Sequence, residues 1–460
     1  MSRPLSLTTD PIPQLTWRIA LPASVGMFFN TMFNFVDTYC AGLLGTDALA
    51  ALSVSFPLFF MMIAVGSGLS QGATAMMANA LGKPDLTAAR HIFAQSLVFA
   101  TAAGFILGIL GLWSGPTVFR MLGADGVYLE QTLRYMNLIF IGAPFFVLAM
   151  AINAGLNSQG KTVPYRNALI AGFIANCLLN PLLMWGTPLT PPLAVGGIAT
   201  ATVIVQIGTC AYLWLKLRAT PLGAEIPRSC FRPHGSVMRE ITGQSVPAAL
   251  NMLTIALGVF VMISYVKHFG QDAVAALGIA TRIEQIVLMP AIGLGSAMLS
   301  IVGQNHGAGL PLRVREAWLT NVTHGAGMMI FGGAAVWFFG ESLMRVFTSD
   351  PEIISKGGEY LRVAAITLAA YPILFVTVFM MQGLKRPGYG LWIGIYRQVA
   401  APVAVYQLLA FTLGWGIAGI WWGMSLVTWS AALFALWWGW RVCEQLVSRK
   451  TSTDLPNPSC

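Results

Sequence analysis

The chain has 460 residues, of which 56% are hydrophobic and only 9% are charged, whereas a soluble domain carries about 25% charged residues. This composition excludes an ordinary soluble protein and predicts a polytopic membrane protein. The net charge of +9 does not indicate nucleic-acid binding, because the basic residues fall in short loops beside apolar segments, where the positive-inside rule applies.

Apolar segments long enough to cross a bilayer follow one another along almost the whole chain, and each span needs about 20 residues. The N-terminal stretch is polar and the first apolar stretch has no small-residue cleavage site, so we expect the first span to be retained. The predicted spans are 15–40, 52–78, 92–114, 134–157, 164–186, 195–216, 244–266, 274–302, 317–340, 362–383, 389–412 and 416–440.

The basic residues predict the orientation of these spans. With the N-terminus inside, the inner segments hold 18 of the 26 lysines and arginines and the outer loops hold 6, while Arg282 and Arg397 lie inside spans. We therefore expect both termini on the cytoplasmic side of a bacterial inner membrane. The six cysteines lie far apart without CxxC spacing, so we expect free thiols and no metal site.

The two halves of the chain resemble each other. Pro22 followed by GTDALAAL recurs as Pro247 followed by GQDAVAAL, and the same shift of 225 residues carries Tyr135 to Tyr360. Two homologous halves of six spans each enter the membrane in the same orientation, since six is even. The predicted domains are an N-terminal bundle at 1–216, a cytoplasmic linker at 217–242, a C-terminal bundle at 243–445 and a cytoplasmic tail at 446–460.

The sequence has no GxxxxGK[ST] loop and no segment long enough for a nucleotide-binding domain. We therefore expect an ion gradient, rather than ATP hydrolysed by this chain, to supply energy.

The first span carries a single carboxylate, Asp37. An ionisable group inside a span is costly and indicates function, although an aspartate at the outer end of the helix is the alternative. Asn30, Phe33 and Asn34 lie seven, four and three residues earlier and are expected on the same face. Pro22 interrupts the hydrogen bonds of the same helix, and is either a hinge or a passive kink.

The fifth span adds a polar pair, Asn176 and Asn180, four residues apart. Side-chain amides can hydrogen-bond a carboxyl group in either protonation state, although contacts between helices are the alternative role. Further candidates for the same pocket are Asn153 and Asn157 in the fourth span and Thr200 and Thr202 in the sixth.

The second half lacks an acid at the equivalent place, because the shift of 225 carries Asp37 to Met262. The coupling chemistry is therefore expected in the N-terminal half alone. Arg282 and Glu284 in the eighth span are expected to pair with each other or to line a cleft. The remaining candidates for buried charge are Arg397 and His324, for which a structural role is equally expected.

Five segments of the chain are distinctive: FNFVDTYCAGLLGTDALAAL, IAVGSGLSQGATAMMANALGK, NSQGKT, ATRIEQ and GLGSAMLSIVGQNHGAG. Together they resemble the multidrug and toxic compound extrusion (MATE) family, and the resemblance covers essentially the whole chain. It implies an all-α membrane protein with twelve transmembrane helices in two pseudo-symmetric six-helix bundles around a central cleft. It also implies a monomeric exporter, not an enzyme, which moves small organic, often cationic and amphipathic, compounds by alternating access without a cofactor.

Within this family the chain resembles the DinF-like branch, which places an acid in the first helix and a polar pair in the fifth. The NorM-like branch relies on an acid in the seventh helix, where this chain has none. DinF-like relatives can carry aspartate where this chain has Asn180, so a second carboxylate is missing. Because Na⁺ favours several hard, charged oxygens, the resemblance favours H⁺ over Na⁺ as the coupling ion.

The expected mechanism is antiport, in which protonation of Asp37 rearranges its hydrogen bonds and lets the first helix bend near Pro22. One alternative is a lipid-linked oligosaccharide flippase of the same superfamily. A flippase would be expected to line its cleft with cations, and only Arg282 and Arg397 are available. An intramembrane enzyme is disfavoured because HExxH and paired-aspartate motifs are missing.

Overall fold

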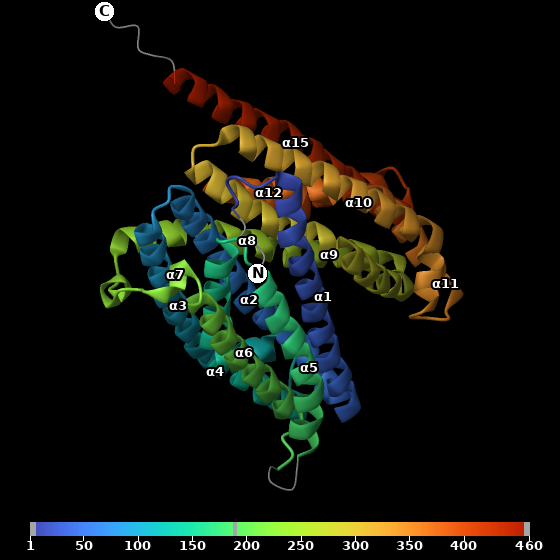
Figure 1. The fold of residues 1–460 in the computed structure, drawn as a ribbon. Coiled ribbons are helices and arrows are strands. Elements are labelled where there is room, and N and C mark those ends of the chain that lie inside the picture. Colours follow the sequence, from blue (N-terminus) through green and yellow to red (C-terminus); the bar gives the residue numbers. More distant parts are fainter. Residues whose placement is uncertain (1–5, 187–190, 455–460) are drawn as a thin grey trace, which may run out of the picture. The chain divides into compact units, whose positions relative to one another are not determined.

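The computed structural model describes residues 6–186 and 191–454, and within these ranges the regular structure is helical. Figure 1 labels the main helices. The first half contains α1 (Ile12–Leu44), α2 (Thr46–Gly82), α3 (Leu86–Met121), α4 (Gly126–Asn157), α5 (Val163–Trp185) and α6 (Val195–Arg218), followed by α7 (Pro221–Ala224) and η1 (Arg228–Phe231). The second half contains α8 (Gly235–Val266), η2 (Lys267–Phe269), α9 (Gln271–Gly307), α10 (Pro311–Arg345), α11 (Pro351–Thr367), α12 (Ala370–Gly383), α13 (Gly388–Ile395), η3 (Tyr396–Ala400), α14 (Ala401–Tyr406), η4 (Gln407–Thr412) and α15 (Gly416–Asp454).

A helical segment lies in each of the twelve predicted spans. Among the described residues, ten helices are long and apolar enough to cross a membrane, and the pair α11–α12, bent by 52°, would form an eleventh span. The remaining segment, 388–412, combines α-helix with the two π-helical stretches η3 and η4. The prediction of an all-α membrane protein is confirmed, and the predicted span at 362–383 falls within the bent pair α11–α12.

The chain forms two compact units. Unit 1 holds the described residues up to Ser24, Gly82–Pro84 and the residues from Leu250 onward, whereas unit 2 holds Val25–Leu81 and Asp85–Ala249. The boundaries inside α1 and α8 are separated by the same 225 residues as the sequence repeat. Each of these two equivalent helices therefore begins in one unit and ends in the other. The domain boundaries predicted from the sequence, at 216 and 243, lie at other positions.

Unit 2 is built on helices that approach one another at glycines. A Cβ atom added at Gly104 of α3 would lie 2.5 Å from the Pro144 Cα of α4, and one added at Gly108 would lie 2.6 Å from the Phe140 carbonyl oxygen. Small residues allow such close packing between transmembrane helices. α6 packs against both α4 and α5, which places the polar stripe of α5 inside this unit.

The predicted linker is docked onto unit 2. The Gln95 side chain of α3 donates to the carbonyl oxygens of Cys230 and Arg232, at 2.6 and 2.8 Å, and its Oε1 accepts from the His234 amide at 2.9 Å. Arg90 also donates to the Pro221 carbonyl at 2.8 Å. These bonds hold the segment between α6 and α8 against α3.

The first part of α1 is held within unit 1. A Cβ atom at Gly293 of α9 would lie 2.7 Å from the Ala20 carbonyl oxygen. The Asn321 amide of α10 donates to the Thr16 hydroxyl at 3.1 Å. Replacing Gly293 would therefore push this part of α1 away from α9.

Candidate functional site

The acid of the first helix lies in a buried network of neutral polar groups in unit 2. Asp37 is 6% exposed, and its Oδ1 accepts a hydrogen bond from the amide of Asn176 and another from the amide of Asn180, both at 2.8 Å. A buried carboxyl group needs such donors because it has lost its hydration. The structure thus brings together α1 and the polar stripe of α5, as the sequence predicts.

The second carboxyl oxygen of Asp37 is held less firmly. The Thr202 hydroxyl of α6 lies 3.3 Å from Oδ2, and it lies closer to the Ile198 carbonyl oxygen, at 3.0 Å. A hydroxyl group has a single proton to donate, so Thr202 is a partial partner of the acid. Tyr135 of α4 is buried and near enough to interact electrostatically with Asp37; the sequence repeat drew attention to this tyrosine but did not assign it to the site.

The predicted neighbours of Asp37 on α1 do not join this network. Asn30 and Asn34 are exposed, and the Asn34 amide donates to the Asn30 carbonyl oxygen at 2.8 Å. Phe33 is half-buried. These residues share one side of α1, but they lie one or two turns from the acid and from the amides of α5.

The candidates on α4 and α6 have separate surroundings. Asn153 is buried, and among the described residues its Oδ1 accepts no hydrogen bond. Asn157 is half-buried near the end of α4. Thr200 donates to the Gly196 carbonyl within α6, at 2.8 Å. Of these candidates, Thr202 is the one that the structure places against Asp37.

Pro22 is buried in α1, three residues before this helix enters unit 2. Proline lacks the amide proton that would bond to the carbonyl four residues earlier. The Ser24 hydroxyl donates to the Ala20 carbonyl oxygen at 2.9 Å. The interruption of the helix ladder thus lies beside the boundary between the units, and its role as a hinge stays a prediction.

In unit 1 the predicted pairing of Arg282 with Glu284 is wrong. Arg282 is exposed, whereas Glu284 is 6% exposed and accepts a hydrogen bond from the Tyr360 hydroxyl at 2.5 Å. Residues two apart on a helix point in nearly opposite directions, so they do not face each other. Arg397 lies in η3 with its guanidinium 5.4 Å from the centre of the Tyr371 ring.

His324 of α10 stacks on Trp17, with ring centres 5.8 Å apart. Among the described residues, no group of three or more His, Cys, Asp or Glu side chains could hold a metal ion.

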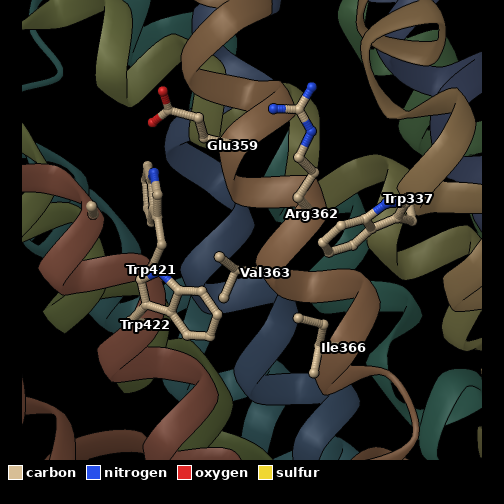
Figure 2. A pocket seen from close by; sticks show the side chains of 8 residues that line it. Trp337, Glu359, Arg362, Val363, Ile366, Trp421 and Trp422 are labelled. Carbon is tan, nitrogen blue, oxygen red and sulfur yellow. The ribbon is translucent and has the colours of Figure 1, made fainter.

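A separate pocket of about 260 Å³ lies in unit 1 between α10, α11 and α15 (Figure 2). The charged groups of this pocket, Glu359 and Arg362, come from α11, and Arg362 is bound to Glu341 at 2.6 Å. None of the predicted site residues lines this pocket. Its tryptophans are Trp337, Trp421 and Trp422.

The comparison with known families matches the chain twice. The profile of the MatE family matches residues 22–182 and 247–415. The two matches begin 225 residues apart, at the two equivalent prolines. This agrees with the internal repeat of the sequence and with the two units of the structure.

Two relatives and a solved structure, each aligned over most of its length, support the same assignment. The chain is 26% identical to a FAD transporter of Shewanella oneidensis over 97% of this chain and 98% of the relative. It is 27% identical to the probable multidrug resistance protein YoeA of Bacillus subtilis over 83% of each protein. A crystal structure of MATE in the bent conformation has the same fold, with a TM-score of 0.91, 24% identity and coverage of 98% of this chain and 100% of that one. The chain therefore belongs to the MatE family.

Proposed function

We propose that the chain exports small organic compounds across a bacterial inner membrane in exchange for protons. The observation that carries this proposal is the buried Asp37 carboxyl group with two amide donors on one oxygen. The name of the Bacillus relative supports multidrug export. We infer a cationic, amphipathic substrate, a monomer and cytoplasmic termini from the sequence pattern described above.

The groups around Asp37 favour a proton as the coupling ion. Asn176 and Asn180 present nitrogen donors to the carboxyl group, whereas Na⁺ needs several oxygen ligands. The amides also bond to each other, since Asn180 Nδ2 donates to Asn176 Oδ1 at 3.2 Å. A site filled by donors stabilises an ionised carboxylate without a metal cation.

The proposed cycle begins with ionised Asp37, which accepts both amide hydrogen bonds. A proton from the outside removes the charge of Asp37, and the carboxyl group then holds the amides of α5 less strongly. α1 bends where Pro22 has already removed one hydrogen bond of its ladder. Bending reduces the space available to the substrate, which leaves to the outside.

The test uses the full chain in proteoliposomes and follows efflux of ethidium under a proton gradient or a sodium gradient. We expect the proton gradient alone to drive efflux, and Asp37→Asn to abolish the driven part. Asp125→Asn is a matched control, because Asp125 is exposed and its side chain makes no capping hydrogen bond. Equal proton-driven efflux by Asp37→Asn and the native protein would disprove the proposal.

A different substrate remains a second candidate because one relative is called a FAD transporter. FAD is a large anion, unlike ethidium, so the two compounds distinguish the substrate classes. Adding FAD as a competitor in the ethidium assay, and measuring its own efflux, tests this candidate. A labelled lipid-linked oligosaccharide in the same liposomes tests the flippase alternative.

A further inference from the structure

Unit 1 has a buried acid of its own, on a different helix from the acid of unit 2. Glu284 of α9 accepts a hydrogen bond from Tyr360 of α11 through Oε2. The Tyr371 side chain of α12 also lies against this carboxyl group, and Arg397 of η3 interacts with it electrostatically. Three helices and a π-helical turn thus converge on one carboxyl group.

The internal repeat shows that this cluster corresponds to the site of Asp37. Tyr360 is the equivalent of Tyr135, since 360 − 135 is 225, and both tyrosines are buried beside the acid of their unit. Met262, the equivalent of Asp37, packs against the apolar cluster that contains Tyr360. The second half therefore retains the buried tyrosine and its apolar surroundings. Its buried acid lies on α9, whereas the helix equivalent to α1 is α8.

The charge of Glu284 is poorly compensated if the group is ionised. Within the described residues it forms no ion pair: the Arg397 guanidinium lies over the Tyr371 ring, and Oε1 accepts no hydrogen bond of acceptable geometry. A buried carboxylate without a paired cation is unfavourable in an apolar interior. A bound proton removes this charge without any movement of the neighbouring helices.

Several side chains surround Glu284 on the elements packed against it. The titratable ones are Tyr360, Tyr371 and Arg397, with Tyr406 of α14 next to the two tyrosines. α15 contributes Met424 and Trp421, which do not titrate. The charged groups of the adjoining part of α10 bind elsewhere, with His324 on Trp17 and Glu341 on Arg362 and Arg345.

The cluster also lies at the irregular part of unit 1. Tyr360 precedes the 52° bend between α11 and α12, and Tyr371 follows it in the first turn of α12. Arg397 belongs to η3 and Tyr406 directly precedes η4, and π-helical turns are frequent at functional sites. Glu284 thus contacts both helices of the bent span, through Tyr360 of α11 and Tyr371 of α12. A change in the charge of Glu284 therefore alters interactions on both sides of the bend.

We propose that Glu284 is a second proton-binding site, in which a carboxyl group held by Tyr360 exchanges a proton with the medium. This site does not depend on Asp37 being the coupling acid. Its ligand is the proton alone, because the nearby guanidinium opposes binding of a metal cation.

Infrared difference spectroscopy of the full chain in lipid, between acidic and alkaline pH, tests this proposal. We expect a carbonyl band of protonated carboxyl groups, of which one component is lost in Glu284→Gln and kept in Asp37→Asn. The matched control is Glu359→Gln, which removes an exposed acid from α11 and should leave the band intact. Tyr360→Phe removes the donated hydrogen bond and should shift the band to higher frequency.

Three results would overturn the proposal. The first is a protonated-carboxyl signal that is the same in Glu284→Gln and the native protein, which would mean that Glu284 stays ionised or does not titrate. If Glu284→Gln fails to fold, the Tyr360→Phe spectrum decides, and a carbonyl band without any shift rejects the assignment. Loss of the band in Asp37→Asn alone would assign it to Asp37 and reject Glu284.

Discussion

The two buried acids of this protein are held in different ways by equivalent units. Asp37 is surrounded by neutral amides on α5, whereas Glu284 is held by a tyrosine hydroxyl with an arginine nearby. Both lie beside a buried tyrosine at the same place in the repeat. The duplicated scaffold therefore preserves the enclosure of an ionisable group, while the helix that supplies the group has changed.

The largest expected effect is on transport by Asp37→Asn. Asparagine has nearly the same shape but cannot exchange a proton, so proton-driven ethidium efflux should fall at least about tenfold, which is about 1.4 kcal/mol in barrier height. Glu284→Gln in the same assay compares the two units directly. If Glu284→Gln lost more driven efflux than Asp37→Asn, coupling would belong mainly to unit 1.

Asn180→Asp should change the ion preference of unit 2. The substitution replaces an amide donor beside Asp37 with a second carboxylate, which supplies the charged oxygens that Na⁺ requires. We expect efflux driven by a sodium gradient to rise several-fold above the native level. Asn180→Leu, which removes both donor and acceptor, should not gain it, and equal sodium response in both variants would contradict the expectation.

Tyr360→Phe should destabilise unit 1. It removes the hydroxyl group that donates to Glu284 Oε2, at a cost of about 1–3 kcal/mol. The measurement is the thermal unfolding of purified protein in detergent. Tyr389→Phe serves as the matched control, because the Tyr389 hydroxyl is buried and has no partner among the described residues. Equal loss of stability in both variants would show that the hydroxyl of Tyr360 contributes nothing specific.

The smallest effect is expected for Thr202→Val. The hydroxyl lies 3.3 Å from Asp37 and is shared with a backbone carbonyl, so its removal should change stability and driven efflux by less than about 1 kcal/mol. The same unfolding and efflux assays apply. A loss of driven efflux as large as that of Asp37→Asn would mean that the hydrogen bond from Thr202 to Asp37 Oδ2 is stronger than its length indicates.

The sequence predicts the site in unit 2 better than the cluster in unit 1. Asp37 and the pair on α5 are rare polar groups in apolar spans, so burial forces them to find each other across 139 residues of chain. Helical spacing also predicted Asn30 and Asn34 on the same side of α1 as Asp37. Spacing does not predict, however, which turn of α1 lies opposite the polar residues of α5. The amides of Asn176 and Asn180 bind Asp37, and Asn180 also interacts with Cys40, which is close to Asp37 on α1.

The Glu284 cluster could not be predicted in the same way. Its donor, Tyr360, is 76 residues away and resembles any aromatic residue of an apolar helix. The bend between α11 and α12 and the π-helical turns of 388–412 come from packing, which leaves no clear signal in an apolar segment. Likewise, the close approach of Gly293 to Ala20, which packs the start of α1 against α9, corresponds to no recognisable sequence motif.

The passage of α1 from unit 1 into unit 2 has a consequence for how the protein is made. The described residues before Val25 belong to the same unit as the residues from Leu250 onward, so they are synthesised well before these partners. Unit 2 is complete once the chain reaches Ala249, while the beginning of α1 must wait in the bilayer for the second half of the protein. Newly made chains released near residue 249 should therefore carry a folded unit 2, while the beginning of α1 still lacks its partners from unit 1.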